Sequence, residues 1–189
     1  MNSLEWIAAA LGLANIVLLV RRSIWNYPFG IAAVSLYFFV FRDAKLYSDA
    51  GLQIFFVAIQ IYGWWNWSRA RRGADALPVA IMSAAARVAW LVATAVAALG
   101  WGWLMARHTD AAAPMVDAAI AVTSVAAQLL LALRRVENWV LWIAVDVTAI
   151  GLFLSRGLHA TAALYALFLV LAVAGLRAWT AAHCAQQRA

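Results

Sequence analysis

The sequence predicts an all-α integral membrane protein with seven spanning helices. Of its 189 residues, 67% are hydrophobic and only 12% are charged, and the mean hydropathy is +0.85. A soluble domain carries about twice that share of charge, so this chain has too little polar surface to cover a water-exposed globule. Helices are the expected form, because lipid cannot satisfy an open backbone and no barrel-like alternation is visible.

Seven apolar segments approach or exceed the length of about 17 residues that a spanning helix needs. They are Leu4–Val20, Ile24–Phe41, Tyr47–Trp67, Val88–Ala106, Met115–Leu133, Asn138–Leu154 and Ala160–Trp179. The first is retained as a span, because no basic stretch precedes it as in a signal peptide. We expect a cytoplasmic linker at 68–87, with room for a short interfacial helix, and a cytoplasmic tail at 180–189.

The basic residues predict the orientation of the chain in the membrane. The formal charge is +6, but its 14 basic residues are spread over several loops, which is no nucleic-acid footprint. Ten of them fall on one predicted side, and Arg42, Lys45, Arg107 and Arg156 fall on the other. The richer side is expected to be cytoplasmic, which places the N-terminus outside and the C-terminus inside.

The chain contains an internal repeat with a shift of 112 residues. The matched pairs include Arg22 with Arg134, Asn26 with Asn138, Gly63 with Gly175, and Trp67 with Trp179. This shift overlays the first three spans (4–67) on the last three (115–179) and leaves 88–106 between them. The result is a 3+1+3 arrangement of parallel repeats, which is typical of transporters that bind substrate near the membrane midplane.

Two spans carry polar residues along one helical face. In the third span these are Asp49, Gln53, Gln60 and Trp64, at spacings of 4, 7 and 4. In the sixth span they are Asn138, Trp142 and Asp146, with Trp139 at the edge of the face. Polar groups are costly in hydrocarbon and usually face a bundle interior or a substrate path. Hydrogen bonding between helices is the competing interpretation.

Substrate contacts are predicted for Gln53, Gln60, Trp64, Asn138, Trp142 and Asp146. The secondary candidates are Asn26, Tyr37, Asp49, Trp139 and Tyr165. Asn26 and Asn138 also suit helix capping. Trp67 and Trp179 are expected to be interface anchors, and Trp65 is expected to face lipid.

The residue types absent from the predicted spans limit the chemical class of the ligand. No Lys or Arg lies in the predicted membrane interior, where a phosphate or carboxylate substrate would normally require one. Aromatic rings, amides and a carboxylate suit a neutral or cationic ring compound. No metal cluster, nucleophile–base set or phosphate loop is visible, so we expect neither an enzyme nor a bound cofactor.

The stretches "LYSDAGLQIFFVAIQIYGWWNW", "VENWVLWIAVDV" and "GLRAW" resemble the PnuC family of bacterial vitamin transporters. The resemblance covers about half of the chain and implies a fold related to that of the SWEET sugar transporters. It also implies a homotrimer in the bacterial inner membrane that works by facilitated diffusion, with the vitamin trapped by cytoplasmic phosphorylation. Gln60 and Asp146 stand where an asparagine is expected in some members that carry nicotinamide riboside.

The sequence therefore predicts a uniporter for nicotinamide riboside that supplies NAD synthesis by alternating access between two three-helix repeats. Thiamine, or another ring-bearing vitamin, is the nearest alternative, because Asp146 would suit a cation. Proton-coupled uptake through Asp49 or Asp146 is a further alternative. A non-transporting membrane scaffold is the alternative from another class. Besides the vitamin, the expected partners are membrane lipid and two further copies of the chain.

Overall fold

The computed structural model describes residues 3–43, 47–72, 77–109, 113–155, 157 and 159–188, and these residues form seven α-helices. They are α1 (Ser3–Val20), α2 (Asn26–Asp43), α3 (Tyr47–Arg71), α4 (Ala84–His108), α5 (Pro114–Ala132), α6 (Asn138–Ser155) and α7 (His159–Gln186). Each expected span overlaps one helix, so the all-helical prediction is confirmed. Helix α7 continues beyond Trp179 because its end is rich in alanine and glutamine, which favour helix.

Length and composition qualify four of the described helices as membrane spans. These are α4, α5, α6 and the Thr161–Gln186 part of α7. Helices α1 and α2 contain shorter apolar runs, Trp6–Val20 and Asn26–Val40. The 25 residues of α3 are long enough, but the polar side chains along this helix lower its hydropathy. The protein is therefore a multi-pass membrane protein.

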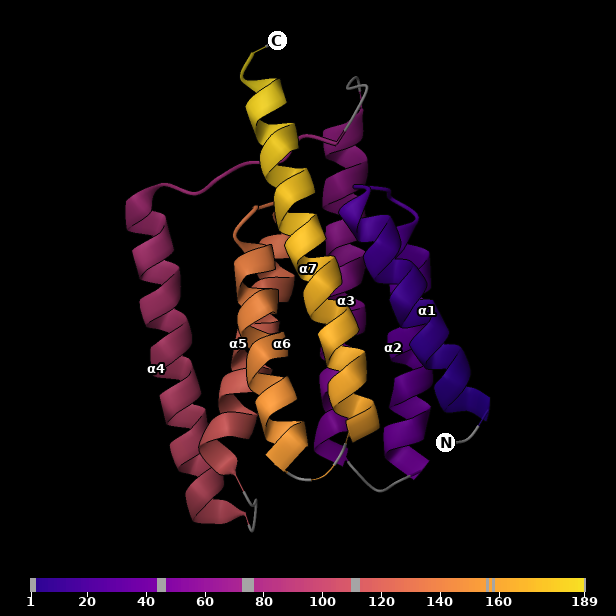
Figure 1. The fold of residues 1–189 in the computed structure, drawn as a ribbon, viewed down its shortest axis with the longest axis vertical. Coiled ribbons are helices and arrows are strands. Elements are labelled where there is room, and N and C mark those ends of the chain that lie inside the picture. Colours follow the sequence, from indigo (N-terminus) through magenta and orange to yellow (C-terminus); the bar gives the residue numbers. More distant parts are fainter. Residues whose placement is uncertain are drawn as a thin grey trace. The chain divides into compact units, whose positions relative to one another are not determined.

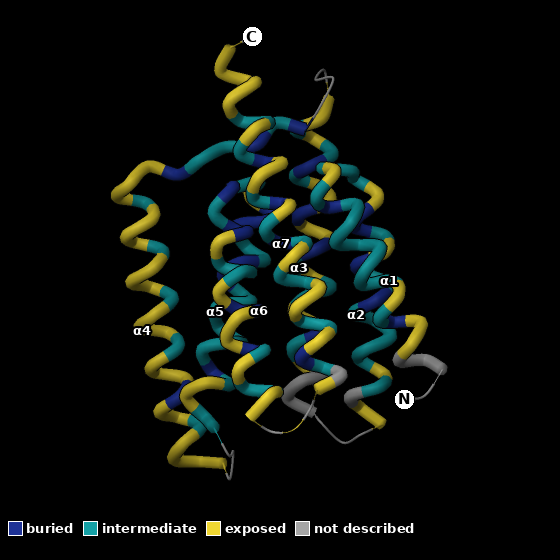
Figure 2. Tube along the Cα trace, in the orientation of Figure 1, coloured by how far each residue is buried: buried dark blue, intermediate teal, exposed yellow. Residues whose placement is uncertain are grey.

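The chain divides into two compact units. The first contains α1, α2 and α3, together with the segment up to Val79, Ala132–Arg134 and the end of α7 from Ala178 onward. Within it, α2 contacts both α1 and α3 (Figure 1). The second contains α4, α5, α6 and α7 up to Arg177. Most of α4 is exposed along its length (Figure 2), and it approaches α5 closely at Gly102, beside Met115.

The turns that follow α1 and α5 have the same backbone geometry. Arg22 and Arg134, which lie 112 residues apart, both adopt left-handed conformations, with φ of 55° and 58°. In each turn the N–H of the next residue donates to the carbonyl five residues earlier, at 2.9 Å. These bonds run from Ser23 N to Leu18 O and from Arg135 N to Leu130 O. Left-handed residues of this kind commonly end helices, although glycine is more usual there. The local fold therefore repeats with the sequence shift.

The helices that follow these turns also begin alike. The side chain of Asn26 donates to Ser23 O at 2.6 Å, and that of Asn138 donates to Arg135 O at 2.6 Å. Both asparagines are buried. Each Nδ2 is thereby committed to the backbone three residues earlier, an arrangement typical of local side-chain bonds at helix starts.

The expectation that Trp67 and Trp179 are interface anchors is wrong. Both side chains have 0% exposure, and their ring centroids lie 5.7 Å apart. Trp179 Nε1 donates to Leu19 O at 3.2 Å, and Tyr27 meets Trp67 edge-on at 5.1 Å. Packing within the first unit encloses these rings, whereas Trp65 is 54% exposed.

The segment before α4 is extended rather than helical. Within the first unit, Arg22 Nη1 donates to Leu77 O at 3.1 Å and Arg134 Nη1 donates to Pro78 O at 3.3 Å. The His183 ring lies 3.3 Å from Val79 O. The expected short interfacial helix is therefore absent from the described residues 77–83. The carbonyls of Leu77 and Pro78 accept from arginine side chains instead, and that of Ala80 accepts from Val136 N at 3.0 Å.

Within the second unit, Glu137 fixes the entry to α4. Its Oε1 accepts from Met82 N and from Arg87 Nε, both at 2.9 Å. The Glu137 side chain is 15% exposed, whereas that of Arg87 is 48% exposed. The hydrogen bond from Met82 N to Glu137 is therefore more shielded from water than the Arg87–Glu137 ion pair, which is largely solvated.

We expect Glu137→Ala to destabilise the protein more than Arg87→Ala. Losing the acceptor leaves the buried Met82 N–H unpaired, which costs about 1–3 kcal/mol. Losing an exposed ion pair costs less than about 1 kcal/mol. Thermal unfolding in detergent would measure both, and equal shifts in melting temperature would contradict the assignment.

Candidate functional site

Helix α3 turns two glutamines of its predicted polar face inward. Gln53 and Gln60 are 8% and 6% exposed, and they lie about 10 Å apart along the helix axis. Trp64, on the next turn, is 40% exposed, so its ring is open rather than enclosed by its own unit. The side chain of Asp49 lies outside the described part of the structure.

Gln60 lies beside residues from two neighbouring helices of its unit. Gly30 on α2 faces it so closely that a Cβ at Gly30 would overlap Gln60 Oε1. The same Cβ would lie 2.5 Å from Asn15 Nδ2 on α1, and that amide also donates to Asn26 O at 2.6 Å. Asn15, Gly30 and Gln60 therefore meet at one point.

Asn15 is absent from the residues predicted for the site. The sequence did give a reason to include Asn15, because it interrupts the apolar run of the first span. A polar residue in a spanning helix is a functional candidate. What the sequence did not show is which helix it contacts. Gly30 was also not predicted as a site residue. Its role is to leave room for the Asn15 and Gln60 side chains by having no side chain of its own.

Helix α6 contributes two buried polar residues to the second unit. Asp146 is 4% exposed and Asn138 is 0% exposed. Among the described residues, Asn138 Oδ1 has no hydrogen-bond partner, whereas its Nδ2 is bonded to Arg135 O. A buried acceptor without a partner is costly, so this oxygen is a candidate for binding a donor group.

The aromatic candidates divide between open and packed positions. Trp142 is partly exposed, one turn from Asp146. Trp139 is 1% exposed and packs against Gly175, where a Cβ would lie 2.5 Å from three of its ring carbons. Tyr165 packs against Phe153 and Phe168, with ring centroids 5.2 and 5.7 Å away. Tyr37 is partly buried and already has a polar or ring contact.

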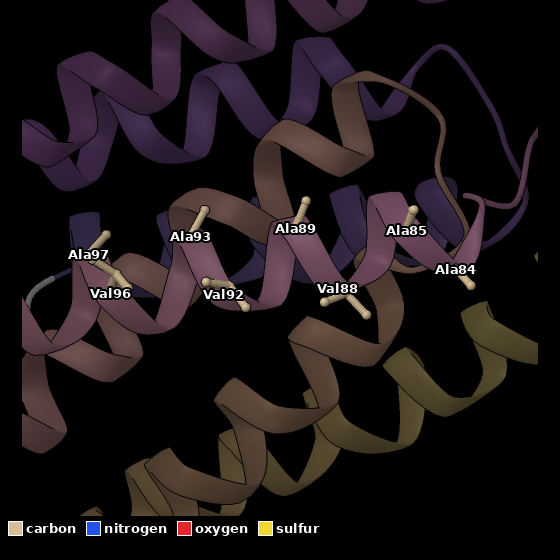
Figure 3. A pocket seen from close by; sticks show the side chains of 8 residues that line it. All are labelled: Ala84, Ala85, Val88, Ala89, Val92, Ala93, Val96 and Ala97. Carbon is tan, nitrogen blue, oxygen red and sulfur yellow. The ribbon is translucent and has the colours of Figure 1, made fainter.

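A surface groove runs along α4, away from these candidates in sequence. It is lined by alanine and valine from Ala84 to Ala97, whose short side chains leave it shallow (Figure 3). None of the predicted substrate residues lines it. An apolar face of this kind is what a lipid-facing helix presents, and it offers no polar group to orient a vitamin.

The described residues gather no three of His, Cys, Asp and Glu in a position to hold a metal ion. Their buried polar groups are instead amides and a carboxylate set among apolar helices. Such groups can hydrogen-bond a small polar molecule or attract a cation inside a membrane protein. The fold and the polar faces therefore define a multi-pass membrane transporter.

Comparison with known proteins gives the family. The chain belongs to the nicotinamide mononucleotide transporter family, which matches residues 2–181. This confirms the PnuC resemblance and the expectation of a transporter rather than an enzyme.

The relatives agree on transport but differ in vitamin. The chain is 30% identical to the nicotinamide riboside transporter PnuC of Escherichia coli (strain K12), over 93% of this chain and 85% of the relative. It is 29% identical to the riboflavin/roseoflavin transporter RibM of Streptomyces davaonensis, over 93% and 83%. The crystal structure of the vitamin B3 transporter PnuC matches with a TM-score of 0.78 and 27% identity, covering 95% of this chain and 81% of that one.

Proposed function

We propose that this protein imports nicotinamide riboside across the bacterial inner membrane by facilitated diffusion. The observation that carries the proposal is the set of buried polar side chains in otherwise apolar helices, namely Gln53 and Gln60 on α3 with Asn138 and Asp146 on α6. The similarity to riboside transporters supports this vitamin. Cytoplasmic phosphorylation of the riboside would then trap it as an anion.

The polar face of α3 in the first unit and that of α6 in the second each offer groups for substrate binding in this proposal. The amides of Gln53, Gln60 and Asn138 bind the carboxamide and the ribose hydroxyls. The open ring of Trp64 on α3 and that of Trp142 on α6 both suit stacking on the pyridinium, and Asp146, one turn from Trp142, attracts its positive charge. No Lys or Arg lies in the interior of the apolar spans to hold a phosphate, which supports one-way retention of the phosphorylated product.

Alternating access in transporters with repeats moves one repeat against the other around a fixed site. The shared turn and helix-start geometry at Arg22–Asn26 and Arg134–Asn138 supports a 3+1+3 architecture of the SWEET type. Seven crossings would place the N-terminus in the periplasm and the arginine-rich ends in the cytoplasm. In this proposal the transporter is a homotrimer surrounded by lipid.

Riboflavin is the second candidate vitamin, because the similarity to RibM is nearly as high as that to PnuC. Thiamine stays a third candidate, since its cationic ring would suit the buried Asp146. Proton coupling through Asp146 predicts that Asp146→Asn removes any response of uptake to a pH gradient. Unchanged uptake in that variant, with no pH response in the wild type, would exclude coupling.

The direct test is isothermal titration of the detergent-purified protein with nicotinamide riboside, riboflavin and thiamine in turn. Binding of the riboside alone supports the proposal. Binding of another vitamin alone reassigns the substrate within the same fold. No binding of any of the three contradicts vitamin transport and favours a scaffold role.

Replacing Gln60 by alanine is expected to weaken riboside binding about tenfold or more. Truncation removes the hydrogen bonds of the amide and leaves the substrate group unpaired, which costs about 1–3 kcal/mol. Titration measures the loss, and the melting temperature reports whether the variant is folded. Gln187→Ala is the matched control, because Gln187 bonds to His183 near the C-terminus. Equal affinity of the wild type and Gln60→Ala would remove Gln60 from the site.

A further inference from the structure

We propose that Asn15 on α1 is a positioning residue that fixes the side-chain amide of Gln60 and thereby sets which kind of group the substrate presents to it. This inference rests on the proposed binding role of Gln60. It adds a residue from a helix that carries none of the predicted substrate contacts.

The Asn15 amide is bonded to the start of α2. Its Nδ2 donates one hydrogen to Asn26 O at 2.6 Å, which fixes the side chain against the start of α2. An amide nitrogen carries two hydrogens. The second remains for another acceptor, one turn further along α2, where Gly30 lies.

The side chains of Asn15 and Gln60 both reach Gly30. Both Gln60 Oε1 and Asn15 Nδ2 lie where the Cβ of any other residue would be. A hydrogen-bond acceptor, Gln60 Oε1, and a hydrogen-bond donor, Asn15 Nδ2, thus lie at the same small gap beside Gly30. Gly30 is what allows the two side chains to approach each other across α2.

The corresponding place in the second half of the chain lacks these two amides. With the shift of 112 residues, Asn15, Gly30 and Gln60 correspond to Ala127, Trp142 and Ala172. Ala127 and Ala172 are buried, at 0% and 3% exposure. The positions of Asn15 and Gln60 can therefore be filled by buried alanines, so packing alone does not require these two amides.

This arrangement defines which end of the Gln60 side-chain amide is left to bind the substrate. In this proposal Asn15 donates its second hydrogen to Gln60 Oε1 beside Gly30, which leaves the Nε2 group of Gln60 to donate. The substrate atom that it recognises is therefore a hydrogen-bond acceptor, such as a carboxamide or ribose oxygen. Nicotinamide riboside offers both kinds of oxygen.

A double-mutant cycle tests this inference. Riboside affinity is measured by titration for the wild type, Asn15→Ala, Gln60→Ala and the double variant. Asn15→Ala alone is expected to weaken binding about three- to tenfold, the range for one lost hydrogen bond. In the Gln60→Ala background the same change is expected to have no effect, because Asn15 acts only through Gln60.

A merely structural role for Asn15 predicts a different result. Its loss would then lower affinity by the same factor in both backgrounds, and that outcome overturns the proposal, as does unchanged affinity in Asn15→Ala. Asn66→Ala is the matched control, since Asn66 makes a similar bond to Ala132 O at 2.8 Å. Its affinity is expected to match that of the wild type.

Gly30→Ala provides a second route that keeps the fold. The atom it meets most closely is the end of a flexible glutamine side chain, which can move aside. We expect little change in melting temperature but weaker riboside binding, and no such weakening in the Gln60→Ala background. If the wild type binds riboflavin or thiamine instead of the riboside, the proposed substrate is wrong, and the cycle is measured with the vitamin that binds. Binding of none of the three, or an affinity in Gly30→Ala equal to that of the wild type, overturns the positioning role.

Discussion

Trp179→Ala is expected to cost about 3–5 kcal/mol of unfolding free energy, the range for removing a fully buried large aromatic side chain. The indole has 0% exposure and stacks near Trp67, and its Nε1 donates to Leu19 O at 3.2 Å. The substitution removes the packing and also leaves the Leu19 carbonyl without that donor. Thermal unfolding in detergent should show a large drop in melting temperature or a loss of folded protein.

Trp65→Ala is the matched control for this experiment. Trp65 is 54% exposed, and Arg69 lies over its ring at 4.7 Å. Truncating it removes an exposed contact, and the expected shift in melting temperature is small. Similar losses for the two variants would show that Trp179 acts at the membrane interface rather than in a packed core.

Gly175→Ala is expected to destabilise the protein by about 1–3 kcal/mol through overpacking. A Cβ on Gly175 would lie 2.5 Å from three carbons of the Trp139 ring, which is itself 1% exposed. A buried ring cannot move aside as a flexible chain end can, so the clash outweighs the better helix propensity of alanine, which is worth about 1 kcal/mol. The measurement is again the melting temperature.

Gly63→Ala should behave in the same way, since its Cβ would lie 2.6 Å from the Tyr27 hydroxyl and close to the ring. The control is Gly151→Ala on α6, where no described atom lies within 4 Å of the added Cβ. That variant is expected to be neutral or slightly more stable. A stabilised Gly175→Ala would mean that Trp139 repacks without cost.

The sequence determined the helices of this protein and the residue types that they carry. Apolar runs about as long as a bilayer is thick can satisfy their backbones only as helices, which is why the expected spans overlap the observed ones. The inward position of Gln53, Gln60 and Asp146 was also predictable, because burying polar groups within the protein is cheaper than exposing them to lipid. The repeated turn geometry at Arg22 and Arg134 follows the sequence shift, because turns depend on neighbouring residues.

Only the tertiary structure decided which side chains meet. Trp67 and Trp179 are tryptophans at the ends of predicted spans, as interface anchors are, yet packing within their unit buries them completely. Asn15 and Gln60 are 45 positions apart in the sequence, and their approach depends on Gly30 of a third helix. Hydropathy and periodicity show which face of one helix turns inward, but they do not fix the rotation and separation of two helices. Those follow from the fit of side chains across the interface, where one missing Cβ is enough to bring two amides together.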